Sequence, residues 1–289
     1  MDSMRDIRTR TRSVRQSLQM TTAMKLISTS KLRKARRRLE ETLPYFEAIR
    51  RTIREIILRA SLDTGKWFDH RTGKANRRVA TLVITADRGL AGGYNNAVIR
   101  HVEEHIPLGS VLLPVGFVGK RTFMERDYLI LEDFPVSSKE PTIANARDIA
   151  NFVADLFLSG KVDEFKIVYT HMLSTVKQVV EELALLPLEH KGLESQSIAT
   201  RKDSPFGCLP DDEVILDLLV PKYLTGVIYG PLVDSFASEQ AARMAAMESS
   251  SKNAKEMLED LQLLYNRARQ GAITAEVSEI VAGAAALGS

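Results

Sequence analysis

The N-terminal segment carries an unbroken helical pattern, and this feature limits the possible folds more than any other. No proline occurs before Pro44 and no glycine before Gly65. Small and apolar residues recur at alternating spacings of four and three, the heptad pattern of a coiled coil. The seam runs through Ile7, Thr11, Val14, Leu18, Thr21, Lys25, Ser28, Leu32, Ala35 and Leu39, and after Pro44 through Phe46, Ile49, Ile53, Ile56 and Ala60. We predict one helix over residues 4–60, about 85 Å long at about 1.5 Å per residue, which is too long for a compact domain.

A second helical segment begins at Asp212 and continues to about Leu287. We expect Pro221, Gly230 and Pro231 to bend or interrupt its first part. Beyond them lies another heptad seam, formed by Met244, Met247, Ser251, Ala254, Leu258, Leu261, Tyr265, Ala268, Ala272 and Ala275. Neither long helix could stay folded alone in water without burying its seam, so we predict that the two pair as an antiparallel coiled coil.

The segment between these helices alternates apolar, strand-like runs with amphipathic helical patterns. We expect a strand at Ala80–Thr85, then a glycine-rich turn and a helix, and the same order in SVLLPVGFVGKRTFMERD. TIANARDIANFVADLFLSG is expected to be helical, and Lys166–Met172 with Lys177–Pro187 to form a hairpin of two strands. Alternation of this kind indicates a sheet with helices on its faces.

The predicted fold class is therefore α/β, with a long antiparallel two-helix coiled coil formed by the terminal helices and a central Rossmann-like domain. The expected boundaries are 1–62 for the N-terminal coiled-coil helix, 63–208 for the central α/β foot domain and 209–289 for the C-terminal coiled-coil helix. The polar, turn-rich stretch 191–211 is expected to be a surface loop or linker.

Positive charge is concentrated in the first predicted helix. The net charge of the chain is +3, but residues 1–59 contain 16 Lys and Arg against 6 Asp and Glu. Within Thr21–Glu40 the basic residues are Lys25, Lys31, Arg33, Lys34, Arg36, Arg37 and Arg38. Two kinds of partner fit such a helix: a nucleic acid, bound through its phosphates, or an acidic protein socket that also accommodates a smooth seam.

Other features exclude several classes of protein. Cys208 is the single cysteine, so neither a disulfide nor a Cys-based zinc site can form within the chain, which suits a reducing compartment. The N-terminus has no apolar signal core, and its helical pattern continues without a break, so we interpret it as mature structure. The most apolar stretch, residues 214–233, contains Asp217, Lys222 and two prolines, so we predict no membrane-spanning segment.

Motifs for catalysis or ligand binding are weak. HVEEH (101–105) matches an inverted zinc-protease motif, but no third ligand accompanies its histidines, so a zinc hydrolase stays only a minor alternative. DRGLAGGYNN (87–96) follows a strand, yet its glycines fit neither the dinucleotide pattern nor the P-loop, and we expect a bare turn with Asp87 near the following helix. The adjacent pair Glu181 and Glu182 should point to opposite faces of a strand. We predict no covalent chemistry and no cofactor.

Three blocks of the sequence resemble one family. IRTRTRSVRQSLQMTTAMKLISTSKLRKAR (7–36) is similar to the N-terminal signature of the gamma subunits of F-type ATP synthases. ITADRGLAGGYN (84–95) resembles the glycine-rich loop of that family. SEQAARMAAMESSSKNAKEML (238–258) and LLYNRARQGAITAEVSEIVAGAAAL (263–287) resemble its C-terminal signature. The blocks lie at both ends and in the middle of the chain, in the family's order, so the resemblance extends over essentially the whole chain.

The resemblance implies a non-catalytic rotor shaft for ATP synthesis and proton or other ion transport. In this family the coiled coil lies inside a hexamer of alternating alpha and beta subunits, and the foot holds the epsilon subunit and contacts the membrane ring of c subunits. Rotation of the ring, driven by ion flow, turns the shaft and moves the catalytic beta subunits through different conformations. The implied location is peripheral, on the cytoplasmic face of a bacterial plasma membrane; the matrix face of a mitochondrial inner membrane is the alternative. The basic helix then meets acidic loops of beta, and no nucleic acid is involved.

The resemblance also implies a set of subunit-interface residues, and no catalytic, cofactor-binding or metal-binding ones. The region facing beta comprises Met24, Lys25, Lys31, Arg33, Lys34 and Arg36. The glycine-rich loop contributes Asp87 and Arg88, near the point where the coil enters the hexamer. The C-terminal helix contributes Arg243, Gln270, Thr274 and Glu276, which contact beta or brace the paired helix. Contact with the ring is expected near 203–213.

The sequence departs from the family pattern at a few positions. Thr22 stands where the family usually has lysine, so one basic contact is expected to be missing. Ala91 replaces the frequent cysteine of the glycine-rich loop, and Gly271 lies inside the terminal helix, where glycine costs about 1 kcal/mol relative to alanine. The single cysteine excludes the redox-switched dithiol insert of chloroplast members.

Overall fold

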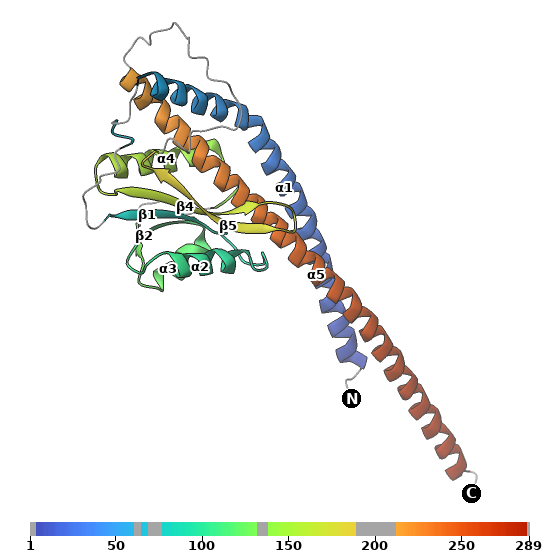
Figure 1. The fold of residues 1–289 in the computed structure, drawn as a ribbon. Coiled ribbons are helices and arrows are strands. Elements are labelled where there is room, and N and C mark those ends of the chain that lie inside the picture. Colours follow the sequence, from blue (N-terminus) through green and yellow to red (C-terminus); the bar gives the residue numbers. More distant parts are fainter. Residues whose placement is uncertain (1–3, 61–64, 69–76, 132–137, 189–211, 288–289) are drawn as a thin grey trace. The chain divides into compact units, whose positions relative to one another are not determined.

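The computed structural model describes residues 4–60, 65–68, 77–131, 138–188 and 212–287 (Figure 1). The chain forms two compact units. Residues 1–29 with 243–289 form the first, called here the coil unit, and residues 30–242 form the second, called here the sheet unit. Both boundaries fall inside the terminal helices, so each of these helices contributes residues to both units.

Helix α1 spans Met4–Ala60 as a single element, which confirms the expected range. Its predicted seam is confirmed as well, since each seam residue whose side chain is described is buried or half-buried. In the sheet unit the seam is fully covered at Ile53, whose exposed fraction is 0%. Pro44 lies inside the helix at an exposed position and does not end it.

Helix α5 spans Asp212–Leu287 without interruption. We expected Pro221, Gly230 and Pro231 to bend or interrupt the first part of this helix. They do not interrupt it, because both prolines lie inside one continuous helix. A proline removes one backbone donor and crowds the preceding turn, at a cost of about 3 kcal/mol. The element persists only if its surroundings offset that cost.

Burial around the prolines supplies this offset. Val220, Leu224 and Ile228 are each 0% exposed and belong to the main core of the sheet unit. Fully burying one such side chain contributes about 1.5–3 kcal/mol. The Thr225 hydroxyl also donates to the Pro221 carbonyl at 2.8 Å. Packing of this segment therefore outweighs its low helix propensity.

The central sheet has five strands in the order β3-β2-β1-β4-β5. The first four run parallel, and β5 pairs antiparallel with β4. The elements are β1 (Val79–Ile84), α2 (Tyr94–His105), β2 (Val111–Val115), α3 (Phe117–Met124), β3 (Leu129–Ile130), α4 (Ile143–Leu158), β4 (Glu164–Met172) and β5 (Gln178–Leu186). Every expected strand and helix is present, and among the described residues the two-residue strand β3 was not predicted. The predicted fold class is confirmed.

The two faces of the sheet carry separate cores. Side chains of α4 and of the sheet-unit parts of α1 and α5 pack on one face, whereas α2 and α3 cover the other (Figure 1). Alternation along β1 shows the division, because Leu82 belongs to the first core and Val83 to the second. Since both faces are covered, the parallel strands read as continuous apolar runs.

The GFVG segment that opens α3 is shaped by its contact with Thr85. Gly116 has a φ of 103°, and a Cβ atom there would lie 2.3 Å from the Thr85 carbonyl oxygen. A Cβ on Gly119 would lie 2.6 Å from the Thr85 hydroxyl oxygen, which accepts the Gly119 N–H at 3.0 Å. Glycine at these two positions therefore allows the start of α3 to pack closely against Thr85, the residue that follows β1.

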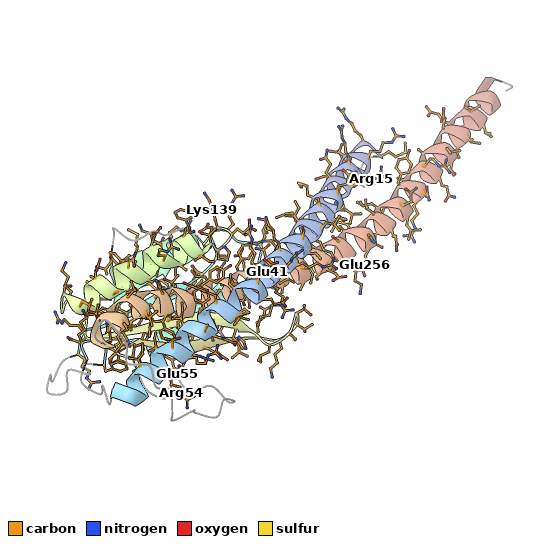
Figure 2. All side chains as sticks on the ribbon, turned by 90° about the horizontal axis from the view of Figure 1, so that it is seen from above. Arg15, Glu41, Arg54, Glu55, Lys139 and Glu256 are labelled. Carbon is orange, nitrogen blue, oxygen red and sulfur yellow. The ribbon has the colours of Figure 1, made fainter. Side chains whose placement is uncertain are left out.

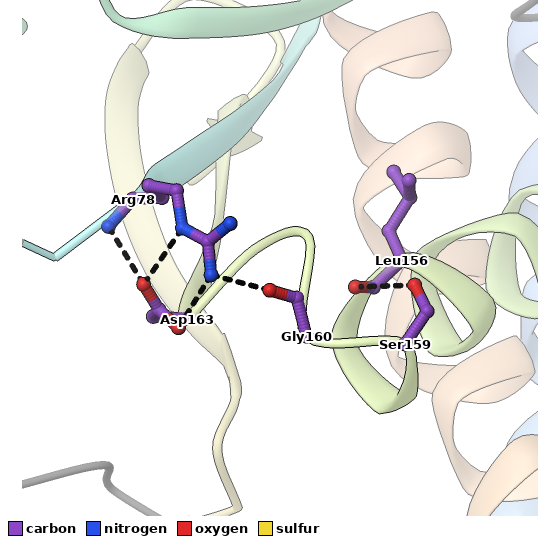
Figure 3. A network of polar contacts seen from close by, with 5 residues as sticks. All are labelled: Arg78, Leu156, Ser159, Gly160 and Asp163. Atoms are coloured by element: carbon purple, nitrogen blue, oxygen red, sulfur yellow. Dashed lines mark hydrogen bonds and ion pairs between the residues drawn. The ribbon is translucent and has the colours of Figure 1, made fainter.

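A buried carboxylate ties the beginnings of β1 and β4 together (Figure 3). The Asp163 side chain is 1% exposed and accepts from the backbone N–H and from Nε of Arg78, both at 3.1 Å. Arg78 also donates to the Gly160 carbonyl, next to the end of α4. Both carboxylate oxygens of Asp163 accept hydrogen bonds from Arg78, so the charged carboxylate can be buried here.

Candidate subunit interface

In the coil unit α1 and α5 run antiparallel, joined by polar contacts across their seam (Figure 2). The Arg8 guanidinium donates to the Tyr265 hydroxyl at 2.5 Å, and the Thr21 and Ser251 hydroxyl oxygens lie 2.7 Å apart. Residue numbers rise along one helix as they fall along the other, as an antiparallel pair requires. The predicted coiled coil is confirmed, and short hydroxyl side chains make its seam thin.

Lys25, which the resemblance assigns to the beta-facing region, has a partner inside the coil. Its ammonium Nζ lies 2.8 Å from Glu248 Oε1, with the lysine side chain 37% exposed. The hydrogen bond from Lys25 lowers the pKa of Glu248. The neighbouring Met24 is half-buried. Lys25 thus braces the helix pair, and its remaining ammonium protons are available to a second acceptor.

Three other predicted interface cations, Lys31, Arg33 and Arg36, are exposed on the sheet-unit part of α1. None of them has an ion-pair partner in the described ranges of the chain. Burying one against an acidic partner would leave no internal contact broken. These side chains therefore have the geometry of a basic docking surface.

Lys34 differs from that group because it is already paired. Its Nζ lies 3.2 Å from Glu140 Oε1, and Arg38 Nη1 lies 2.9 Å from the same oxygen. Glu140 precedes α4 and lies about a hundred residues away in sequence, so no local sequence pattern could have predicted this contact. The structure thus places Lys34, like Lys25, in an intramolecular ion pair and adds Arg38 beside it.

Asp87 does not lie where the sequence placed it. The N-cap of the following helix α2 is Gly93, which has no side-chain cap. Asp87 Oδ1 instead accepts the backbone N–H of Phe117, at the start of α3, at 3.3 Å, and that of Ser138 at 2.9 Å. The expectation of a bare turn with Asp87 near the α2 N-cap was therefore wrong, because these donors come from segments distant in sequence.

The rest of the glycine-rich loop presents side chains outward. Leu90 is 65% exposed and has a φ of 63°, a left-handed conformation that is uncommon for leucine. The neighbouring Arg88 is also exposed. Ala91, at the position of the family's frequent cysteine, is instead 2% exposed and packs with Tyr94 and Ala242. The loop is thus anchored by Ala91 and displays Leu90.

The predicted C-terminal interface residues divide into two groups. Arg243 is half-buried, whereas Gln270, Thr274 and Glu276 are exposed. The Thr274 hydroxyl donates to the Gln270 carbonyl at 2.9 Å, a contact within the helix. None of the last three has a partner on α1 in the described part of the chain.

The end of α5 is apolar but unpaired. The predicted seam ends at Ala268, because α1 begins at Met4 and the described chain offers Ala272 and Ala275 no facing helix. The placement of these two alanines in the seam was wrong for that reason. Large apolar side chains beyond this point are exposed by 50–65%: Ile273, Val277, Ile280 and Val281. Such a surface is typical of a segment that a partner covers.

The two histidines of the HVEEH motif contact each other and a neighbouring strand. His101 and His105 share one face of α2 with rings stacked 4.3 Å apart, and His101 Nε2 lies 3.2 Å from Glu182. Glu181 points away from them and accepts from Tyr169, whose pKa is raised chiefly by burial. Within the described residues, no group of three or more His, Cys, Asp or Glu could hold a metal ion. His70, His190, Cys208 and the expected ring contact at 203–211 lie outside the described ranges.

One helix passes a length-and-composition test for a membrane span. The segment Val214–Ala282 of α5 contains an 18-residue window that is apolar enough, and 44% of that window is buried inside the protein. Buried core helices pass the same test. The prediction that nothing spans a membrane stays a prediction.

Comparison with known proteins identifies the family. The family model described as ATP synthase matches residues 3–287. The chain is 42% identical to the ATP synthase gamma chain of Ruminiclostridium cellulolyticum, covering 99% of both chains. It is 38% identical to the sodium-ion-specific ATP synthase gamma chain of Acetobacterium woodii, again over 99% of both.

The fold is also found in a solved structure. A chain of the Euglena gracilis mitochondrial ATP synthase, in an assembly described as OSCP/F1/c-ring, matches with a TM-score of 0.66 at 19% identity, over 98% of this chain and 94% of that one. At this identity the match supports the fold alone. The family model and the full-length relatives carry the assignment: this chain belongs to the ATP synthase gamma chain family.

Proposed function

We propose that this chain is the central rotor shaft of an F-type ATP synthase. In this role it catalyses no reaction itself and couples ion-driven rotation of the membrane ring to ATP synthesis or hydrolysis at the alpha/beta hexamer. The observation that carries the proposal is the coil unit, whose thin antiparallel helix pair ends in an unpaired apolar segment of α5. The full-length relatives named ATP synthase gamma chain support it.

The partners follow from this role. The exposed apolar end of α5 and the unpaired cations Lys31, Arg33 and Arg36 contact the alpha and beta subunits. The glycine-rich loop of the sheet unit, in which Arg88 and Leu90 are exposed, also contacts these subunits. The foot, residues 63–208 between the helical segments 1–62 and 209–289, holds the epsilon subunit and the ring of c subunits. The complex is peripheral, on the cytoplasmic face of a bacterial membrane.

Reconstitution tests the proposal directly. The full chain is combined with alpha and beta subunits of a gamma-chain relative, and ATP hydrolysis is measured together with rotation of a bead attached to the foot. We expect a stable complex whose hydrolysis is accompanied by unidirectional rotation. A complex that hydrolyses ATP while the bead stays fixed, or no complex at all, would contradict the shaft role.

The nucleic-acid alternative has no support among the relatives and makes its own prediction. Binding through the basic segment would require DNA affinity that falls steeply with salt, because counterions are released from the phosphates. A filter-binding titration at physiological salt decides between the two readings. We expect no saturable binding.

Charge reversal on α1 tests the docking surface. The double variant Arg33→Glu/Arg36→Glu should lower rotation-coupled hydrolysis by about threefold to tenfold, since an exposed ion pair contributes about 0–1 kcal/mol and reversal turns attraction into repulsion. Arg121→Glu, on α3 with its side chain 88% exposed, is the matched control and should leave the rate unchanged. Equal effects of both changes would assign the loss to net charge rather than to the α1 surface.

A further inference from the structure

The carboxyl edge of the parallel strands is the usual ligand site of a doubly wound sheet. Ligands of such sheets bind in the crevice where the strand order reverses. Here β1 has β2 on one side and β4 on the other, so the reversal lies between β1 and β4. The sequence contains no motif that predicts nucleotide binding in this crevice.

Helix α5 occupies this edge. The Ser235 hydroxyl accepts the backbone N–H of Thr170 on β4 at 3.1 Å, and the Ser238 hydroxyl donates to the Thr170 carbonyl at 3.2 Å. Leu232 and Phe236, on the same stretch of α5, are about 6% exposed and belong to the main core. The chain's own helix therefore packs over this edge of the sheet.

A small cavity remains beside α5, with a volume of about 20 Å³. Its apolar lining includes Ile84, Val115, Leu232 and Phe236. Its polar lining includes Thr85, Ser138, Lys139, Asn145 and Glu239. A cavity needs roughly 10–15 Å³ to hold one water molecule and two or more polar partners to keep it there.

The polar lining contains a hydroxyl without a partner among the described residues. Ser138 Oγ is buried and makes no hydrogen bond within that part of the chain. Its backbone is held in place, because the Ser138 N–H donates to Asp87 Oδ1 at 2.9 Å and the adjacent loop is fixed through Glu140 to Arg38. The carboxylate-bearing residue Glu239 is 7% exposed. Burying an unpaired hydroxyl destabilises a protein, so a bridging group is expected here.

We propose that this cavity holds one ordered water molecule that accepts from or donates to Ser138 Oγ and donates to the Glu239 carboxylate. The water joins the loop before α4 to helix α5 at the carboxyl edge of β1. The proposal is independent of the rotor function.

Water-oxygen magnetic relaxation dispersion on the full chain counts buried, slowly exchanging waters and tests the proposal. We expect Ser138→Ala to lower this count by about one relative to the unmodified chain, because the water loses its hydroxyl partner. Ser159→Ala, which removes a hydroxyl that bonds within its own helix end, is the matched control and should leave the count unchanged. An unchanged count in Ser138→Ala would overturn the bridge.

A high-resolution crystal structure of the unmodified chain gives a second, independent readout. A density peak about 2.6–3.2 Å from both Ser138 Oγ and a Glu239 carboxylate oxygen would support the proposal. An empty cavity, or a direct hydrogen bond between the two side chains, would overturn it. Circular dichroism of Ser138→Ala checks that the variant is folded before either result is interpreted.

Discussion

The sheet unit and the coil unit differ in how completely they bury their side chains. The sheet unit buries large side chains completely, among them Phe123, Phe157 and Leu224 at 0% exposure. In the coil unit most of the seam is only half-buried, and hydroxyl pairs such as Thr21 with Ser251 take the place of apolar contacts. Since stabilisation follows the apolar area removed from water, the sheet unit should carry most of the stability. The coil unit instead keeps a thin seam and an unpaired end, as a surface for partners requires.

We expect the largest loss of stability where the backbone at Gly116 packs against the Thr85 carbonyl. Gly116→Val should unfold the chain or destabilise it by more than about 4 kcal/mol, because its Cβ would overlap the Thr85 carbonyl and its φ of 103° suits only glycine. Gly89→Val, where a Cβ meets nothing within 4 Å, is the control. Thermal unfolding measures both. Similar melting temperatures would refute the close-packing account.

The buried ion pair should come next. Asp163→Ala removes a carboxylate that is 1% exposed and accepts from the backbone N–H and the half-exposed guanidinium of Arg78, and we expect a loss of about 2–4 kcal/mol. Urea unfolding gives the free energy. Asp127→Ala is a suitable control, since Asp127 is exposed and precedes β3 at the same, amino end of the parallel strands. A loss below about 1 kcal/mol would mean that solvent already screens the pair.

Leucine truncations compare the two units directly. Leu224→Ala should destabilise the sheet unit by about 3–4 kcal/mol, because it leaves a cavity in a fully buried site. Leu258→Ala, at a half-buried seam position of the coil unit, should cost about 1 kcal/mol. Hydrogen exchange of α5 locates each loss. Equal losses would break the proposed contrast between the units.

The smallest expected effect is the pH dependence of the coil. Lys25 lowers the pKa of Glu248 from its ordinary value of 4.5, so the pair stabilises the fold above about pH 4.5 and this contribution disappears as the pH falls through the lowered folded pKa. Glu248→Gln should abolish that part of the acid sensitivity and leave stability at neutral pH nearly unchanged. Helicity measured against pH in both proteins checks this. A larger loss at neutral pH would indicate a stronger pair than its exposure implies.

Predictions about interface residues separate local patterns from long-range contacts. The exposure of Lys31, Arg33 and Arg36 follows from their places off the heptad seam, and the sequence alone indicated it. The pairing of Lys34 with Glu140 does not follow from the sequence, because no local pattern around either residue indicates the other as its partner. Which of these residues contact other subunits stays a prediction.

The sequence by itself determined the periodic features: both seams, the length of α1, the α/β alternation and the hairpin of β4 and β5. Each depends on spacing within one segment, and side-chain burial on a helix or strand repeats with that spacing. Tertiary structure alone decided the continuity of α5 through Pro221 and Pro231, the position of Asp87 at the start of α3, and the end of the seam at Ala268. These depend on which distant segment supplies a core, a donor or a facing helix. Propensity is a local quantity of about 1–3 kcal/mol per residue, so contacts between distant segments can outweigh it.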